Sequence, residues 1–354
     1  MGNPASPLSE ARIYLDHAAT TPVSEAARAA MMEGLARWAN PSSPHAEGRA
    51  GRAVLEDARG RVKRALCWDG HVIFTSGASE AIAIALTTAK AERIVTSPVE
   101  HDAVLRVTPA AERLPVDTAG CVTGTVPGAL HAIQHVNNES GVIQPIADLA
   151  ASIHEEGGLL FCDCAQGAGK LDLPQEADMI AVSAHKFGGP PGIGALLVRN
   201  LALLRPTGGQ EQGYRGGTEN WPAVLGMAAA LEEGCGWMDE AARLRAVLDD
   251  AVREGGGEVV AGSAPRIAAI ASYRMPGVSA RAQLIRFDMA GFAVSAGAAC
   301  SSGTLKTSPV LKAMGWSDKA ADEVIRVSFG PQTSEDDVHA FITLWCEMAA
   351  QKAA

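Results

Sequence analysis

The sequence predicts an α/β protein whose large domain holds a mostly parallel sheet between helices, followed by a smaller α+β domain. Short apolar runs alternate with helical stretches from residue 72 onward, which is the pattern of βαβ units. Polar clusters directly follow several of these runs, and ligands of open α/β sheets bind beyond the carboxyl ends of the strands. Beyond the glycines at 255–257 the expected strands become shorter. We therefore expect a large domain over residues 16–255 and a small domain from residues 1–15 and 256–354.

Each expected element rests on a local pattern. Pro22 and Ser24 open a helix through about residue 37, and a charged helix at 47–66 follows the proline-bounded loop 40–45. In the rest of the large domain, strands are expected at 72–75, 94–95, 114–116, 131–136, 159–162, 179–182 and 195–198, with helices at 81–89, 146–155 and 222–254, the last broken near 234–236. In the small domain, strands are expected at 267–273, 294–295 and 324–329, with helices at 280–289, 309–314 and 334–349.

The composition is that of an ordinary globular protein, with 47% hydrophobic and 20% charged residues in a chain of 354. The net charge of −10 disfavours a general nucleic-acid or membrane-surface binder, because phosphates would be repelled. No stretch approaches the ~20 apolar residues of a membrane span, and the N-terminus lacks the pattern of a signal peptide. The seven irregularly spaced cysteines fit neither a disulfide framework nor a zinc site, so we expect a cytoplasmic location and no metal.

Lys186 lies just after the apolar run 179–182 and before a loop rich in glycine and proline. A lysine in this place can form a Schiff base with pyridoxal phosphate (PLP), while the neighbouring Ser183 and His185 hold the cofactor phosphate. An exposed lysine before an ordinary turn is the alternative. The small residues at 76–80 open a helix whose free backbone N–H groups favour an anion, although a plain capping turn has the same pattern.

Two further polar residues follow expected strands. Asp163 comes after the run 159–162, where a carboxylate could keep the PLP ring nitrogen protonated, cap a helix or bind a metal. The flanking Cys162 and Cys164 have no second pair of ligands nearby in sequence, which disfavours the metal. His101 follows the run 94–95, where it could stack on the ring and relay protons, or simply begin a helix.

Cys300 and Arg326 stand out in the small domain. Cys300 lies in a segment of glycine, alanine and serine, where a thiol is more typical of a nucleophile than of a core residue. Arg326 interrupts an apolar strand, and a buried arginine needs a partner. That partner could be a substrate carboxylate or a structural salt bridge.

Taken together, these residues resemble the cysteine desulfurases of the first group, which belong to the class V aminotransferase-like PLP enzymes. The resemblance extends from Tyr14 to about Phe329. It rests on the segments at 15–22, 40–45, 75–80, 100–101 and 135–139, on Asp163 with Gln166, and on the segments at 183–186, 215–219, 296–302 and 325–330.

The resemblance implies PLP-dependent transferase fold type I, with a seven-stranded sheet in the PLP-binding domain and the catalytic cysteine on a loop of the small domain. It implies that Lys186 binds the aldehyde of PLP, and that the phosphate is held by Ser79, Ser183, His185 and the backbone at Ala78. Asp163 would contact the ring nitrogen, Gln166 the ring hydroxyl and His101 the face of the ring. Asn138 and Arg326 would orient the substrate carboxylate and the cofactor. It also implies a homodimer in which Thr218 reaches the phosphate of the neighbouring subunit.

The implied reaction takes sulfur from L-cysteine, with catalytic roles for Cys300, Lys186 and His101. It gives L-alanine and a persulfide on Cys300, which passes to an acceptor in iron–sulfur cluster assembly or tRNA thiolation. Ser79 stands where the family usually has threonine, and Cys164 replaces a smaller residue or threonine. A selenocysteine lyase, an aminotransferase on the same fold and a protein without enzymatic activity remain alternatives.

Overall fold

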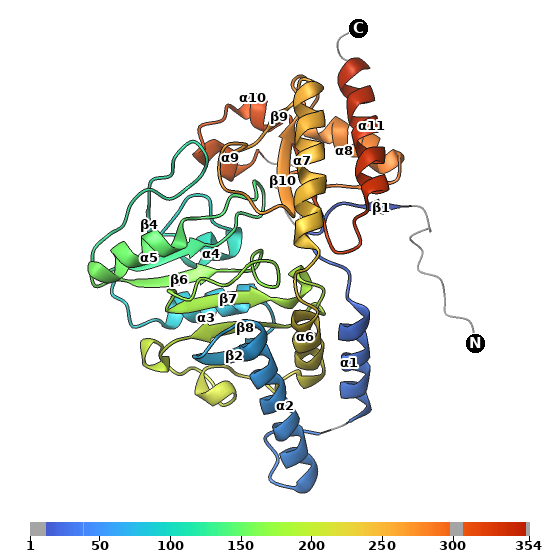
Figure 1. Cartoon of the computed structure of the whole chain (residues 1–354). Coiled ribbons are helices and arrows are strands. Elements are labelled where there is room, and N and C mark those ends of the chain that lie inside the picture. Colours follow the sequence, from blue (N-terminus) through green and yellow to red (C-terminus); the bar gives the residue numbers. More distant parts are fainter. Residues whose placement is uncertain (1–11, 38, 298–306, 352–354) are drawn as a thin grey trace, which may run out of the picture. The chain divides into compact units, whose positions relative to one another are not determined.

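The computed structural model describes residues 12–37, 39–297 and 307–351 (Figure 1). It divides the chain into two compact units. Unit 1 contains the described residues up to Ala18, Glu139–Gly141, and those from Trp237 onward. Unit 2 contains those in Ala19–Asn138 and Val142–Gly236.

Unit 2 is a layered α/β structure. Its strands are β2 (His71–Thr75), β3 (Ile94–Thr96), β4 (Glu112–Arg113), β5 (Leu130–Gln134), β6 (Leu159–Asp163), β7 (Met179–Ser183) and β8 (Gly194–Val198). Its helices are α1 (Glu25–Ala36), α2 (Ala46–Ala65), α3 (Ala78–Thr88), α4 (Asp102–Val107), α5 (Ile146–Glu155) and α6 (Trp221–Glu232). Three short 3₁₀ turns complete its described elements, η1 (Ala184–Lys186), η2 (Leu201–Leu203) and η3 (Glu211–Gly213).

The seven strands form one sheet in the order β2-β8-β7-β6-β5-β3-β4. Neighbours pair in parallel except around β8, which is antiparallel to both β7 and β2. Residues 184–193 between β7 and β8 are fewer than the dozen or so that a parallel crossover needs. The chain therefore returns beside β7 in the opposite direction, and the predicted mostly parallel seven-stranded sheet is confirmed.

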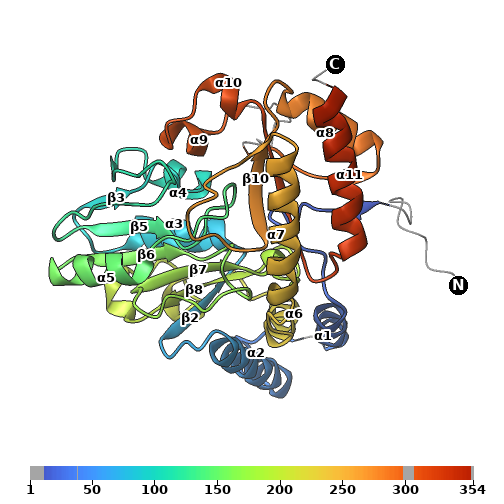
Figure 2. The same cartoon turned by 45° about the horizontal axis from the view of Figure 1, so that its top comes forward.

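The alternation of side chains along the strands produces two cores. On β2, Val72 and Phe74 pack with α2, α5 and α6, whereas Ile73 packs with α3 and α4 on the other face (Figure 2). β6 repeats the pattern, with Leu160 and Cys162 on the first face and Phe161 on the second. Because both faces are covered by helices, the inner residues of these strands are apolar on both sides.

Unit 1 is a smaller α+β structure. Its strands are β1 (Ile13–Tyr14), β9 (Glu258–Val259), β10 (Ile270–Arg274), β11 (Phe292–Ala293) and β12 (Val324–Ser328). Its helices are α7 (Met238–Glu254), α8 (Ala280–Met289), α9 (Pro309–Ala313), α10 (Asp318–Ala321) and α11 (Glu335–Gln351). β10 pairs with β12 and β9 in antiparallel sense, and β1 pairs with β11 in parallel.

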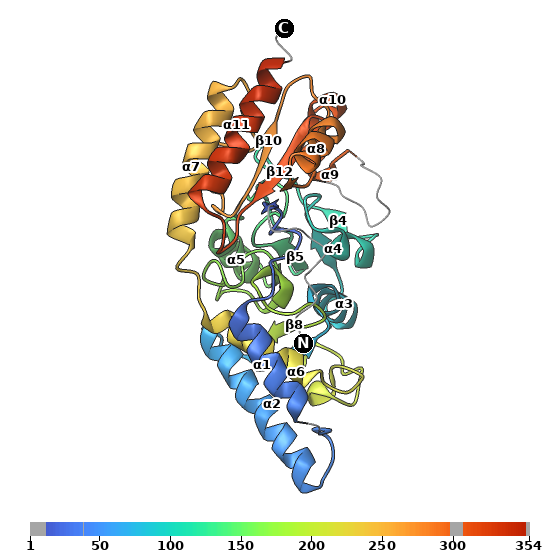
Figure 3. The same ribbon diagram turned by 90° about the vertical axis from the view of Figure 1, so that its right-hand side faces the viewer.

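The division into units falls at residue 236 instead of the expected glycine-rich point after 255. The reason is that α7 packs beside α11, where Leu244, Leu248 and Val252 join the core of unit 1 (Figure 3). The glycines at 255–257 form the turn between α7 and β9. A second difference concerns the strand expected at 114–116, because β4 ends at Arg113 and is exposed.

Over the described ranges, no helix is long and apolar enough to cross a membrane. The same residues contain no group of three or more histidine, cysteine or acidic side chains placed to hold a metal ion.

Candidate active site

Most of the site residues expected from the sequence lie at one edge of the unit 2 sheet. β2, β3, β5, β6 and β7 run in the same direction, so their carboxyl ends meet at that edge. The residues that follow these ends are Ala78 and Ser79 after β2, His101 after β3, Asn138 after β5, Asp163 and Gln166 at and after β6, and Ser183, His185 and Lys186 at and after β7. Topology alone brings together nine residues from five strand ends that are far apart in sequence.

Asp163 is the buried carboxylate of this edge. Its Oδ1 accepts a hydrogen bond from the backbone N–H of Ala165 at 2.9 Å. Burial raises the pKa of Asp163, while the charges of His101 and Lys186 act to lower it. The carboxylate therefore faces a histidine and a lysine from two other strand ends, and a bound cation there would favour its ionised form.

The segment Ala19–Thr21 holds the turn that carries Lys186. The Lys186 ammonium donates to the carbonyl of Ala19 at 2.8 Å, and the N–H of Thr21 donates to the carbonyl of His185 at 2.8 Å. His185 Nδ1 lies 3.2 Å from the hydroxyl of Thr20. Burial, with the charges of Lys186 and Lys170, lowers the pKa of His185 to about 4, so its ring is neutral near pH 7.

The N-terminus of α3 forms a cradle suited to an anion. Gly77 precedes α3 with φ of 153°, and within the described chain no side chain caps the helix. A Cβ at Gly77 would lie 3.5 Å from the Ser183 hydroxyl, and one at Gly194 would lie 2.7 Å from Gly77 Cα. Gly77 has a φ that residues with a side chain rarely adopt, and Gly194 packs directly against it. The first N–H groups of the helix are therefore left without a capping side chain, which is the arrangement that binds phosphate.

The three remaining residues at this edge are held in different ways. His101 is exposed, and its Nδ1 accepts from the N–H of Ala103 at 3.1 Å, which fixes the ring at the start of α4. The side chain of Gln166 is buried and that of Asn138 partly so. Lys170 donates to the backbone carbonyl of Gln166 at 3.2 Å.

Two buried titratable side chains near the site, Glu100 and Lys170, were given no role from the sequence. Glu100 accepts a hydrogen bond from the Ser97 hydroxyl at 2.6 Å, and burial raises its pKa to about 8. Burial and the charge of Lys186 lower the pKa of Lys170 to about 7. The sequence marks them only weakly: Glu100 adjoins His101, and Lys170 ends the turn at 165–170 that follows β6.

Thr218 lies on the loop before α6 and is exposed. The same loop is tied to the start of α3, because Arg215 Nε donates to Glu80 at 2.9 Å. The loop is thus anchored beside the anion cradle.

Among the expected site residues that the structure describes, Arg326 belongs to unit 1. Arg326, on β12, forms an ion pair with Asp16, with 2.7 Å between Nη2 and Oδ1. Cys300 lies outside the described residues.

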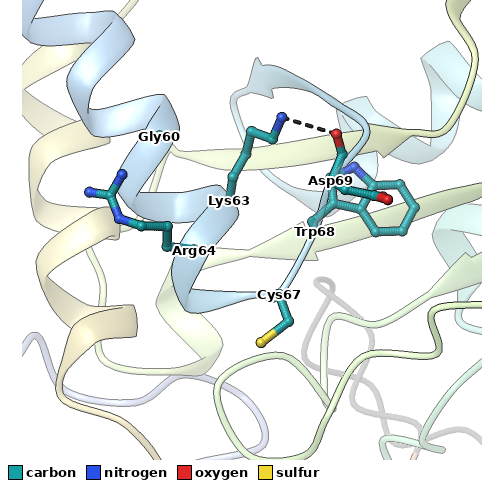
Figure 4. Close-up of a pocket in the computed structure, with 6 residues that line it drawn as sticks. All are labelled: Gly60, Lys63, Arg64, Cys67, Trp68 and Asp69. Atoms are coloured by element: carbon teal, nitrogen blue, oxygen red, sulfur yellow. Dashed lines mark hydrogen bonds between the residues drawn. The ribbon is translucent and has the colours of Figure 1, made fainter.

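A separate surface hollow of about 420 Å³ lies where α2 ends (Figure 4). It is lined by Gly60, Lys63, Arg64, Cys67, Trp68 and Asp69. None of the residues expected for the active site lines it.

Comparison with known proteins defines the class of this protein. Residues 13–341 match the model of the aminotransferase class-V family, so the chain belongs to that family. The family is PLP-dependent, which confirms the predicted cofactor and fold type.

The curated relatives include several cysteine desulfurases. The chain is 36% identical over 361 residues to a cysteine desulfurase of Gluconacetobacter diazotrophicus, a match that covers 92% of this chain and 90% of the relative. It is 35% identical over 367 residues to the cysteine desulfurase IscS of Dictyoglomus turgidum, covering 92% of each. A solved NifS-like protein superposes with a TM-score of 0.87 at 28% identity, covering 96% of this chain and 99% of that one.

Proposed function

We propose that this chain is a cysteine desulfurase that takes sulfur from L-cysteine, releases L-alanine and passes the sulfur to an acceptor through Cys300. The observation that carries the proposal is the meeting of Asp163, His101 and Lys186 at one sheet edge, beside an anion cradle. The relatives named as cysteine desulfurases support the substrate. A related solved structure, with 28% identity and a TM-score of 0.79, is described as SspA in complex with cysteine.

The residues present fit PLP. The N-terminus of α3, with Ser79 in its first turn and Ser183 close to Gly77, would hold its phosphate, and His185 would contribute from the turn after β7. Asp163 would hold a proton on the ring nitrogen, Gln166 would contact the ring hydroxyl, and His101 would cover the ring; the closeness of His101 and Lys186 to Asp163 supports these roles. When bound, PLP supplies an electron sink for the α-carbon of the substrate.

Each of the chain's own site residues has a separate role in the proposed reaction. Lys186 Nζ takes the proton from the substrate Cα, while Arg326 and Asn138 orient the substrate carboxylate. The Cys300 thiolate attacks the substrate sulfur. The Cβ–S bond of the substrate breaks and a new S–S bond forms on Cys300. Cβ keeps the electron pair and gains a proton, and Lys186 Nζ returns a proton to Cα. The products are L-alanine and a persulfide.

The finer assignments extend this proposal. The protein forms a homodimer in which the exposed Thr218 completes the phosphate site of the neighbouring subunit. The sulfur acceptor is a protein or reductant of iron–sulfur assembly or tRNA thiolation. The location is cytoplasmic, in keeping with cysteines that are all free in the described chain.

The test measures L-alanine and sulfide together from the PLP-loaded protein with L-cysteine and a thiol reductant. We expect equal yields of both, lost in Cys300→Ala and in Lys186→Ala. Absence of alanine from a PLP-loaded protein would overturn the proposal. Activity confined to selenocysteine would favour a selenocysteine lyase, and amino transfer that survives Cys300→Ala would favour an aminotransferase.

A further inference from the structure

Glu139 touches the chain on both sides of the segment that carries Cys300. The Ser308 hydroxyl donates to Glu139 Oε2 at 2.5 Å. Gly297 approaches the same oxygen so closely that a Cβ built there would lie 2.1 Å from it. One buried carboxylate oxygen thus meets residue 297 before the segment and residue 308 after it.

The backbone beneath Glu139 is firmly held within unit 1. The Ser272 hydroxyl, on β10, donates to the Glu139 carbonyl at 2.8 Å. Two residues on, the Gly141 carbonyl accepts from the N–H of Ile267 at 2.8 Å. Gly141 has φ of 77°, and a Cβ there would lie 2.2 Å from the carbonyl oxygen of Ile270, so only glycine fits. Glu139 therefore projects from a short, fixed stretch of chain.

Ser308 is fixed as well. It is buried, and its hydroxyl accepts from the N–H of Leu311 while it donates to Glu139, so it caps α9 and contacts the carboxylate with one group. Burial raises the pKa of Glu139, whereas Ser308 and the charge of Arg326 act to lower it. Losing the carboxylate would leave a buried hydroxyl without its acceptor, which costs more than the bond itself contributes.

We propose that Glu139 is a positioning residue for the sulfur-transfer step, acting by fixing residues 297 and 308 on either side of Cys300. The proposal rests on the proposed function. Glu139 takes no part in the chemistry of the α-carbon, which belongs to Lys186 and Asp163. Its contribution is confined to how often the thiol of Cys300 reaches the substrate sulfur, since a displacement of about 1 Å can cost on the order of 100-fold in rate.

The experiment separates the two half-reactions in the PLP-loaded full-length protein. Exchange of the Cα hydrogen of L-alanine in D₂O reports on Lys186 and PLP without any need for Cys300. Single-turnover formation of alanine from L-cysteine needs the thiol. The rate of Cys300 alkylation by iodoacetamide, followed by mass spectrometry without substrate, reports on the position of the thiol alone.

For Glu139→Gln we expect alanine formation to fall by about 10-fold or more, with Cα exchange within about twofold and a changed alkylation rate. Ser308→Ala should act in the same direction. The double variant should lose little beyond the larger single effect, because Glu139→Gln weakens and Ser308→Ala removes the same hydrogen bond. Gly297→Ala offers a second route, because its Cβ would push the carboxylate away from Ser308. The matched control is Glu240→Gln, a surface carboxylate paired with Arg243.

Equal losses of exchange and sulfur transfer would overturn the proposal, as would a Glu139→Gln protein that behaves like Glu240→Gln. If Glu139→Gln fails to fold, Gly297→Ala and Ser308→Ala decide by the same criteria. Failure of the proposed function has a different signature. The unaltered protein would then exchange the hydrogen of L-alanine but form no alanine from L-cysteine.

Discussion

Each unit contains a buried carboxylate beside residues of the proposed reaction, and the two carboxylates have different surroundings. Asp163, in unit 2, accepts from one backbone N–H and faces two groups that can carry positive charge. Glu139, in unit 1, accepts from a serine hydroxyl and packs against a glycine. The surroundings of Asp163 control the charge of its carboxylate, whereas the contacts of Glu139 fix the position of the backbone at residues 297 and 308. The comparison teaches that identical chemical groups in one protein can serve electrostatics in one place and geometry in another.

The largest expected effect tests the electrostatic half of this comparison. Asp163→Asn keeps the shape of the side chain but removes the charge that would hold a proton on the PLP ring nitrogen. We expect both Cα exchange of L-alanine and alanine formation from L-cysteine to fall by about 100-fold or more, as when other electrostatic partners are removed from active sites. The rates of both reactions, measured in samples quenched at a series of times, check this expectation. A loss of sulfur transfer alone would make Asp163 resemble Glu139 and break the comparison.

A smaller effect is expected at Arg326, which is already paired with Asp16. Arg326→Lys keeps the positive charge but loses the planar fork that binds a carboxylate through two parallel hydrogen bonds. We expect KM for L-cysteine to rise by about 10-fold, equivalent to ~1.4 kcal/mol, with a lesser change in kcat. Initial rates over a range of L-cysteine concentrations check this. An unchanged KM would leave Arg326 as a structural partner of Asp16.

The smallest expected effect concerns Glu100, which lies close enough to Asp163 for their charges to interact. Its pKa in the folded protein is about 8, against about 4.3 in an unfolded chain. The protonated form therefore stabilises the fold below the unfolded pKa, and this contribution is lost as pH rises through 8. The glutamine of the Glu100→Gln variant cannot ionise. The free energy of unfolding of this variant, relative to that of the unaltered protein, should therefore increase by about 1 kcal/mol or more between pH 5 and pH 9.

Urea unfolding at pH 5, 7 and 9 measures this difference. Glu240→Gln, on the surface, serves as the control and should show no comparable trend. A difference that is the same at all three pH values would mean that Glu100 is ionised in the fold. It would then compete with Asp163 for positive charge, and the electrostatic account of the site would need revision.

The sheet could be predicted from the sequence because each of its strands and helices has a local sequence pattern. Alternating apolar runs and helices predicted the parallel strands, and the polar residues after them met at one edge because parallel strands share their direction. The contacts of Glu139 could not be predicted in this way, because Gly297 and Ser308 are far along the chain and no periodic pattern links them. The burial of Lys170 was equally hidden, since a lysine in a polar turn is usually exposed. The place of α7 was missed because an amphipathic helix does not reveal which core it joins.

The pairing of β1 with β11 has a consequence for how the chain matures on the ribosome. Ile13 is aligned with Phe292, a partner made about 280 residues later. At ~5–20 residues per second, translation of that interval takes on the order of 15–60 s. Every residue of unit 2 has been translated once Gly236 is made, well before this partner exists. β1 is therefore among the last strands of the described chain to find its place, and it must stay unpaired with β11 until then.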